Sequence, residues 1–192
     1  APATFDETYT AVTPSLGLRY AVQPTLQVFG SVHRSVEPPT FNPLLSPRGG
    51  NPKKGPSRFA VSDLEAQSGT TVEVGTRRTQ GRLEWDVTAY RTWLKNELLT
   101  TSAIFGGSGT TANAPVRTIH QGLEMQADLR LLNGLLIDRG AGDRLSMQTT
   151  YTLSDFYFDT DAQNQLAGVP RHRLHAQLRY EHPAGLAVEP NL

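Results

Sequence analysis

The chain has 192 residues, and its 18 Lys plus Arg balance its 18 Asp plus Glu, so it carries no net charge at pH 7. Without a basic surplus there is no electrostatic footprint for nucleic acid, and we expect no nucleic-acid partner. The absence of cysteine excludes a disulfide scaffold and any thiolate metal site. No run of about 18 apolar residues exists in the sequence, so no membrane-spanning helix is expected.

Apolar and polar residues alternate along much of the chain, which predicts β-strands with one apolar and one polar face. The expected strands, in chain order, cover residues 15–22, 26–33, 70–77, 82–89, 119–131, 144–153 and 173–180, and an eighth begins at Leu186. The second of these is the weaker pattern, because Phe29 falls on its polar side.

The stretch 119–131 alternates most regularly. Its odd positions are apolar apart from Gln121, whereas its even positions hold no apolar side chain larger than glycine. Thirteen residues at about 3.3 Å each, tilted by about 45°, cover roughly 30 Å, which is the thickness of a bilayer core. Strands of soluble proteins are usually about five or six residues long. The stretch therefore predicts a wall between lipid and water.

Short and long connections alternate between the expected strands. The segments 23–25, 78–81 and 182–184 are short, 133–143 is intermediate, and 35–69, 95–115 and 156–170 are long. Outer-membrane barrels have short periplasmic turns and long extracellular loops. We therefore predict an all-β chain that forms part of an antiparallel up-and-down transmembrane β-barrel.

Aromatic residues support the same interpretation. They lie on the apolar faces near short turns (Tyr20, Trp85, Tyr180) and near long loops (Trp93, Tyr151). Transmembrane barrels carry such girdles at both interfaces, on either side of an apolar band about 25 Å tall. A soluble β-sandwich would instead bury these rings in its core, and it leaves the loop pattern unexplained.

Several segments resemble TonB-dependent outer-membrane receptors, and they occur in the family's order. They are Pro14-Ser15-Leu16-Gly17-Leu18-Arg19-Tyr20, residues 28–41 with Arg34 and Pro38-Pro39, Glu73-Val74-Gly75-Thr76-Arg77, residues 89–98 with Asn96-Glu97-Leu98, Gly122-Leu123-Glu124, and Leu166 to His172. The resemblance covers nearly the whole chain and is of the ferric-siderophore receptor type. It implies a 22-stranded barrel in the outer membrane of a Gram-negative bacterium, with an N-terminal plug and a TonB box.

The resemblance also implies that residues 1–192 are a partial barrel domain of about eight strands. The plug, the N-terminal strands and the final C-terminal strands would lie outside it, and the TonB–ExbB–ExbD system would act through that N-terminal part. A small closed eight-stranded barrel is the alternative, although the last strand stops short. An unclosed set leaves two open edges that hydrocarbon cannot satisfy, so we expect that this piece alone would not insert as a stable barrel.

The sequence gives no sign of an enzyme. It has no nucleophile elbow and no Ser-His-Asp spacing. The glycine-rich stretches 50–55 and 106–109 lack the features of a phosphate cradle. His172 and His175 would lie on opposite faces of one strand, which makes them a poor ligand pair. We expect no resident metal or cofactor, and polar-face charges are expected to line an aqueous interior.

Ligand contacts are expected near the long loops, where Arg34, Tyr90 and His120 lie close to strand ends. Arginine and aromatic groups suit an anionic ferric chelate. For any single one of the three, rim solvation or interface anchoring is the more ordinary role. Arg117 lies in the same region, but its parity points to the lipid side.

The resemblance implies energy-coupled uptake of a ferric siderophore from outside the cell. Receptors for cobalamin, haem, nickel or sugars share the architecture, and the sequence does not separate them. A passive porin-like protein or small outer-membrane barrel is the alternative, and a soluble carbohydrate-binding β-sandwich is a more distant one. A plug and TonB box upstream would exclude the porin.

Overall fold

The computed structural model describes residues 8–40, 44–48, 58–101, 110–137 and 142–190. Within these residues it contains the following strands: β1 (Ser15–Gln23), β2 (Leu26–Glu37), β3 (Leu45–Arg48), β4 (Arg58–Val61), β5 (Gln67–Arg78), β6 (Leu83–Lys95), β7 (Leu98–Thr101), β8 (Thr110–Asn113), β9 (Thr118–Asn133), β10 (Arg144–Phe158), β11 (Asp161–Gln165), β12 (His172–Glu181) and β13 (Ala187–Val188). Within the described ranges, no helix has the length and apolar content needed to cross a membrane.

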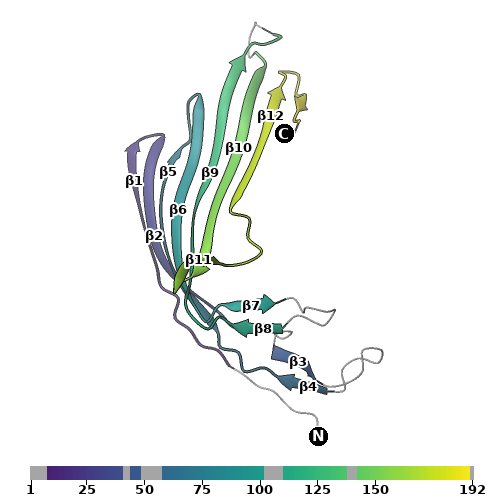
Figure 1. Ribbon diagram of the computed structural model, residues 1–192. Helices are drawn as coiled ribbons and strands as arrows, with labels where there is room; N and C mark the ends of the chain where they lie inside the picture. The colour runs from purple at the N-terminus through teal and green to yellow at the C-terminus, as the bar shows by residue number, and fades with distance from the viewer. Residues whose placement is uncertain (1–7, 41–43, 49–57, 102–109, 138–141, 191–192) are drawn as a thin grey trace, which may run out of the picture.

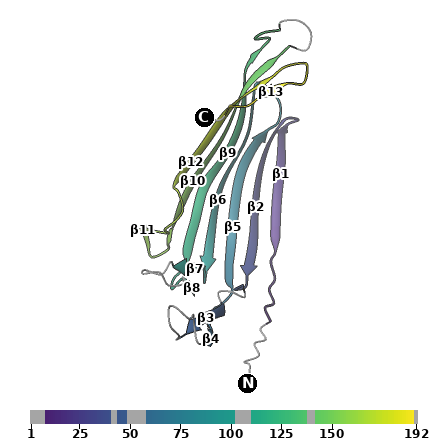
Figure 2. The ribbon, with the colours of Figure 1, turned by 90° about the vertical axis from the view of Figure 1, so that its right-hand side faces the viewer.

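The long strands form one antiparallel sheet in the order β1-β2-β5-β6-β9-β10-β12-β13, and β11 pairs with β10. Figures 1 and 2 show this sheet as a curved wall, with β1 at one edge and β12 and β13 toward the other. Two separate hairpins, β3–β4 and β7–β8, project from the end where the long connections leave (Figure 1). The predicted up-and-down meander is confirmed, and the sheet does not close on itself within the described chain.

The strands are longer than the alternation alone predicted. The longest, β9, has 16 residues, β10 has 15 and β6 has 13. Sixteen residues at about 3.3 Å, tilted by about 45°, reach roughly 37 Å, so β9 extends beyond a bilayer core. Most of the added length lies toward the long connections, where apolar and polar residues no longer alternate strictly, as in residues 154–158 of β10. The strand expected from Leu186 is reduced to β13, Ala187–Val188.

The two faces of the sheet differ in chemistry and in exposure. On β5, Thr71 of the polar face is 8% exposed, whereas Val72 and Val74 of the apolar face are 43% and 61% exposed. On β1, Leu18 is 74% exposed. A β-sandwich would bury these apolar side chains beneath a second sheet. In the described chain no second layer covers them, so the sandwich interpretation is not supported.

Two glycines of the polar face make room for aromatic rings on the neighbouring strand. Phe29 is paired across the strands with Gly75, and Tyr90 with Gly122. A methyl group on Gly75 would collide with the Phe29 ring, and one on Gly122 would lie 2.8 Å from the Tyr90 hydroxyl oxygen. A ring on the polar side is therefore accommodated by the absence of a side chain opposite it, which explains why Phe29 does not disrupt β2.

Replacement of Gly122 by alanine is expected to destabilise the wall. The added methyl group would meet the Leu153 carbonyl oxygen, which is backbone, as well as the Tyr90 ring. Overpacking of this kind costs about 1–3 kcal/mol. We expect the variant to unfold at a lower urea concentration than the parent. The midpoint is measured on the membrane-extracted protein from the heat-modifiable shift in its electrophoretic mobility.

Gly17→Ala is the matched control, because its methyl group would have no neighbour nearer than 3.9 Å. Equal midpoints for Gly122→Ala and Gly17→Ala would contradict the packing described for Tyr90.

Candidate ligand-binding wall

The cross-strand register brings Tyr90 and His120 to the same polar face, near the long-loop end. Thr92 of β6 is opposite His120 of β9, which is opposite Phe156 of β10. One step along the face, Tyr90 is opposite Gly122, which is opposite Ser154. The two predicted residues therefore lie in neighbouring rows of one wall.

His120 is held between an aromatic ring and a carboxylate. Its imidazole stacks on the Phe156 ring with centroids 4.1 Å apart and planes at 6°. Its Nε2 lies 3.1 Å from Glu97 Oε1, and Glu97 also accepts a hydrogen bond from the Thr118 hydroxyl. The side chains of His120 and Glu97 are only 20% and 13% exposed. His120 thus fixes the chain that leads from β6 into the β7–β8 hairpin.

The pKa of the Glu97 carboxyl is lowered from its ordinary value of 4.5. Burial is the largest single effect and raises it, but the hydrogen bonds from His120 and Thr118, with the charge of His120, together outweigh burial. A carboxylate with a lowered pKa stabilises the fold above its ordinary pKa, and this contribution disappears as pH falls through the lower value. The contacts of Glu97 with His120 and Thr118, which hold the β7–β8 hairpin, are therefore expected to weaken in acid.

A second polar cluster ties the same hairpin to the chain before β5. The Asn113 side-chain nitrogen donates to the backbone oxygens of Glu65 (2.9 Å) and Asn96 (2.8 Å), and the Glu65 backbone N–H donates to Asn113 Oδ1 (2.8 Å). The Asn96 side chain donates to the Glu65 carboxylate. Asn96 has a φ of 55°, a left-handed conformation that asparagine tolerates better than most residues. Sequence analysis did not identify this cluster.

The hydroxyl end of Tyr90 lies over Gly122, where a larger residue would collide with it. The Tyr90 side chain is hydrogen-bonded to Ser154. Neighbouring residues add further hydroxyl groups. Thr71 and Thr92 are hydrogen-bonded at 2.8 Å, and the Ser31 hydroxyl donates to Glu73 at 2.9 Å. The wall around Tyr90 therefore offers hydroxyl groups and aromatic edges, which can hydrogen-bond and stack on a polar cargo.

Arg34 does not join Tyr90 and His120. It is paired across the strands with Thr70, and Thr70 is paired with Trp93, so Arg34 shares the apolar face of the sheet. The sheet itself separates Arg34 from the other two residues. Arg117 also lies on the apolar face, as its parity predicted, and its Nε donates to Asp159 Oδ2 at 2.6 Å.

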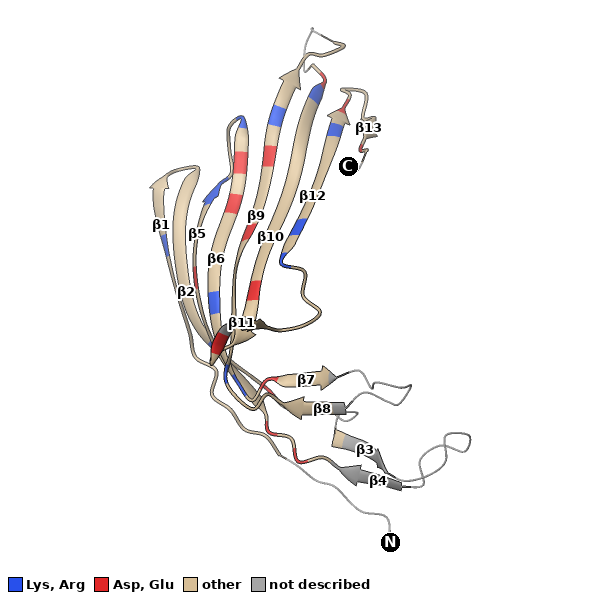
Figure 3. Ribbon diagram, in the orientation of Figure 1, with Lys and Arg blue, Asp and Glu red and all other residues tan. Residues whose placement is uncertain are grey.

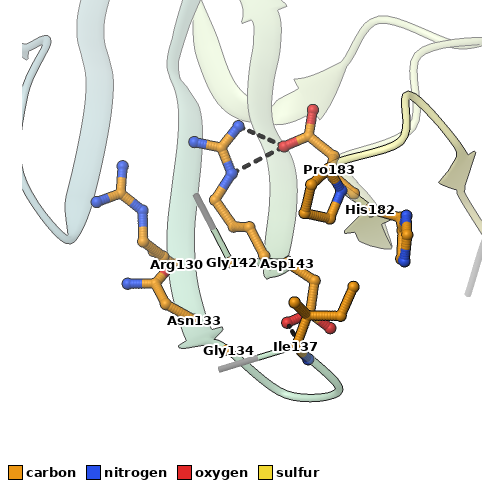
Figure 4. Close-up of a pocket in the computed structure, with 10 residues that line it drawn as sticks. Arg130, Asn133, Gly134, Ile137, Gly142, Asp143, His182 and Pro183 are labelled. Carbon is orange, nitrogen blue, oxygen red and sulfur yellow. Dashed lines mark hydrogen bonds and ion pairs between the residues drawn. The ribbon is translucent and has the colours of Figure 1, made fainter. Parts of the chain in front are cut away.

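A hollow of about 650 Å³ lies at the opposite end of the strands, beside the β9–β10 connection (Figure 4). Two of its charged residues, Arg144 and Asp143, have partners on neighbouring parts of the chain. Arg144 Nε donates to Glu181 at 2.8 Å, and the buried Asp143 carboxylate accepts from the Leu136 backbone N–H at 2.9 Å. Burial raises the pKa of Asp143, but its hydrogen bonds, the Leu136 amide among them, outweigh this and lower the pKa. These contacts hold the β9–β10 connection in place and join β10 to β12.

Charged residues of the polar face concentrate in the half nearer the short turns. Figure 3 shows carboxylates on β6, and carboxylates with an arginine on β9, toward the end of the sheet opposite the β3–β4 and β7–β8 hairpins. Neighbouring strands pair them, as in the Arg77–Asp86 hydrogen bond of 2.6 Å. The described residues contain no group of three or more His, Asp or Glu placed to hold a metal ion.

The family model for the β-barrel of TonB-dependent receptor-like proteins matches residues 1–189. The chain belongs to this family. The fold of this chain also resembles two solved structures from Pseudomonas aeruginosa. The siderophore receptor PirA has a TM-score of 0.61 and 19% identity, over 93% of this chain and 32% of PirA. The ferric enterobactin receptor PfeA, in complex with enterobactin, has a TM-score of 0.61 and 18% identity, over 92% of this chain and 27% of PfeA.

At this level of identity the two receptors support the fold. The chain spans about a third or less of the length of each. No curated protein matches the chain. The family and the two structures are receptors rather than enzymes, and the family is one of outer-membrane β-barrels in Gram-negative bacteria.

Replacement of Glu97 by glutamine is expected to loosen the β7–β8 hairpin at neutral pH, because the charge-assisted bond to His120 and the strong acceptor for Thr118 are lost. In the parent protein the same loosening is expected only as pH falls below about 4.5, the ordinary pKa of the carboxyl. Hydrogen exchange of the β7 and β8 amides, corrected for intrinsic rates, measures both effects.

Glu37→Gln is the control, because Glu37 is an exposed carboxylate at the same end of the sheet that contacts Gln67 instead. If the β7 and β8 amides of Glu97→Gln exchange as slowly as those of the parent protein, and speed up in acid to the same extent, then Glu97 does not hold the hairpin in place.

Proposed function

We propose that the chain is part of an outer-membrane receptor that takes up ferric-siderophore complexes by energy-coupled active transport in a Gram-negative bacterium. The observation that carries this proposal is the family match over residues 1–189, together with the likeness to two receptors for siderophores. The curved sheet supports it, because its polar and apolar faces suit an aqueous bore on one side and lipid on the other.

The proposal includes the organisation of the whole protein. Residues 1–192 would be a partial barrel domain, and the plug, the earlier strands and the final strands would lie elsewhere in the protein. The coverage of about a third of PirA and just over a quarter of PfeA supports this organisation. The TonB–ExbB–ExbD system would then couple energy through the N-terminal part, and the cargo would be a siderophore or similar metal chelate with no resident cofactor.

Within the proposal, Tyr90 and His120 belong to the wall that the cargo meets. Tyr90 presents a phenol on the polar face beside Ser154. The His120 ring nitrogen contacts Glu97, and the Phe156 ring covers one face of the imidazole. Its contribution is therefore to fix the chain between β6 and the β7–β8 hairpin. Arg34 lies across the sheet from this wall and is not assigned to the cargo.

Uptake of iron tests the proposal. Cells that lack the gene for the protein are expected to lose uptake of radioactive iron from at least one ferric siderophore in a panel of catecholate and hydroxamate chelates. Inactivation of TonB is expected to abolish the same uptake. Unchanged uptake of every chelate would contradict the proposed cargo, and uptake that persists without TonB would indicate a passive, porin-like protein.

Tyr90→Phe tests the wall. It keeps the ring over Gly122 and removes only the hydroxyl group. A lost hydrogen bond of ordinary strength, about 1 kcal/mol, corresponds to roughly fivefold weaker binding of the cargo. Tyr20→Phe is the control, because Tyr20 is 69% exposed on the apolar face. Equal affinities of the two variants for the ferric siderophore, measured on whole cells, would remove Tyr90 from the site.

A further inference from the structure

Three cations gather around a hollow on the apolar face, at the long-loop end of the sheet. The hollow has a volume of about 410 Å³ and is lined by the side chains of Arg34, Ser68, Thr70, Trp93, Lys95 and Arg117. We refer to these six residues as the basic hollow. Its residues come from β2, β5, β6 and the segment just before β9, so four neighbouring parts of the wall contribute to it.

All six side chains of the basic hollow belong to the same face. Alternate residues of a strand share a face. On β2, β5 and β6, the residues of the hollow are separated by an even number of positions from Val32, Val72 and Val87, which lie on the apolar face. Arg117 has the parity of Ile119, which is opposite Trp93. The basic hollow therefore opens away from the wall that holds Tyr90, and a cargo on the polar face could not reach it through the sheet.

The basic hollow carries more positive than negative charge. Arg117 is paired with Asp159, but no ion pair among the described residues involves Arg34 or Lys95. Arg91 adds a fourth cation beside the hollow, with its guanidinium 5.2 Å from the centre of the Trp93 ring. The hollow thus has the charge and the hydroxyl donors of Ser68 and Thr70 to receive an anion.

The height of the basic hollow identifies the source of that anion. Trp93 lies eight residues along β6 from Trp85, or about 19 Å when the strand is tilted. Between them the apolar face holds side chains such as Val87 and Ala89. Tryptophan marks the level of lipid head groups in transmembrane barrels, and arginine and lysine extend toward the same level.

We propose that the basic hollow binds the phosphate of an anionic lipid head group, in the leaflet that surrounds the barrel at its long-loop end. Basic pockets at the membrane interface bind phosphorylated head groups, and each Lys or Arg near such a surface strengthens binding by about fivefold. The inference rests on the outward orientation of the apolar face and is independent of the cargo. Its test measures lipid binding, so a protein that fails to take up siderophores could still bind the lipid as proposed here.

The experiment compares the complete protein with the double variant Arg34→Gln/Lys95→Gln. Both are placed in phosphatidylcholine nanodiscs with or without phosphatidic acid, whose head group ends in a phosphate. Retained phosphatidic acid is then counted by native mass spectrometry. The parent is expected to retain it selectively, and the double variant is expected to bind it roughly 10–30-fold more weakly. The charge-conserving variant Arg34→Lys is expected to bind nearly as well as the parent.

Arg19→Gln/Arg173→Gln is the matched control, because it removes two exposed cations from the polar face. Equal loss in the control, or equal retention in Arg34→Gln/Lys95→Gln, would overturn the proposal. A final comparison adds inorganic phosphate alone to the protein, in place of phosphatidic acid. If it raises the midpoint of thermal unfolding as much as phosphatidic acid does, the basic hollow takes a soluble anion and the lipid assignment is wrong.

Discussion

Every backbone N–H and C=O group at the depth of a bilayer core needs a partner inside the protein, because hydrocarbon offers none. The antiparallel ladders of this chain meet that requirement along most of its length. The central strand β9 is paired with β6 on one side and with β10 on the other. Because the ladders fix the register, they also fix which residues share a face, and the chemistry of both faces follows from them.

The same ladders keep two kinds of chemistry apart across the thickness of one sheet. Tyr90 and His120 lie on the polar face, among hydroxyl groups and rings, where a hydrated cargo can be met. Arg34 is at a similar height but on the apolar face, beside Trp93. A shift of one residue in the register of β2 would move Arg34 to the polar face, so the pairing of Phe29 with Gly75 also determines where Arg34 lies.

The sequence predicted the strands that cross the apolar band, and with them the fold, because alternation is strict wherever one face must be apolar. It failed where apolar and polar residues stop alternating. The β7–β8 hairpin and the upper part of β10 near Asp155 carry no period-two signal. The parity of Arg34 was readable from Val32, but Phe29 blurred the pattern of that strand until the structure placed it over Gly75. The burial of Asp143 depends on backbone amides of its own turn, which no periodicity reveals.

The central claim is that the apolar face meets acyl chains while the polar face meets water. Residues 1–192 contain no cysteine. In a version of the membrane-embedded protein that is free of other cysteines, single cysteines at positions 123, 124, 125 and 126 of β9 can each carry an environment-sensitive fluorophore. The account predicts quenching by nitroxide-labelled acyl chains at 123 and 125, and by a water-soluble nitroxide at 124 and 126. Uniform quenching, or the reverse alternation, would contradict it.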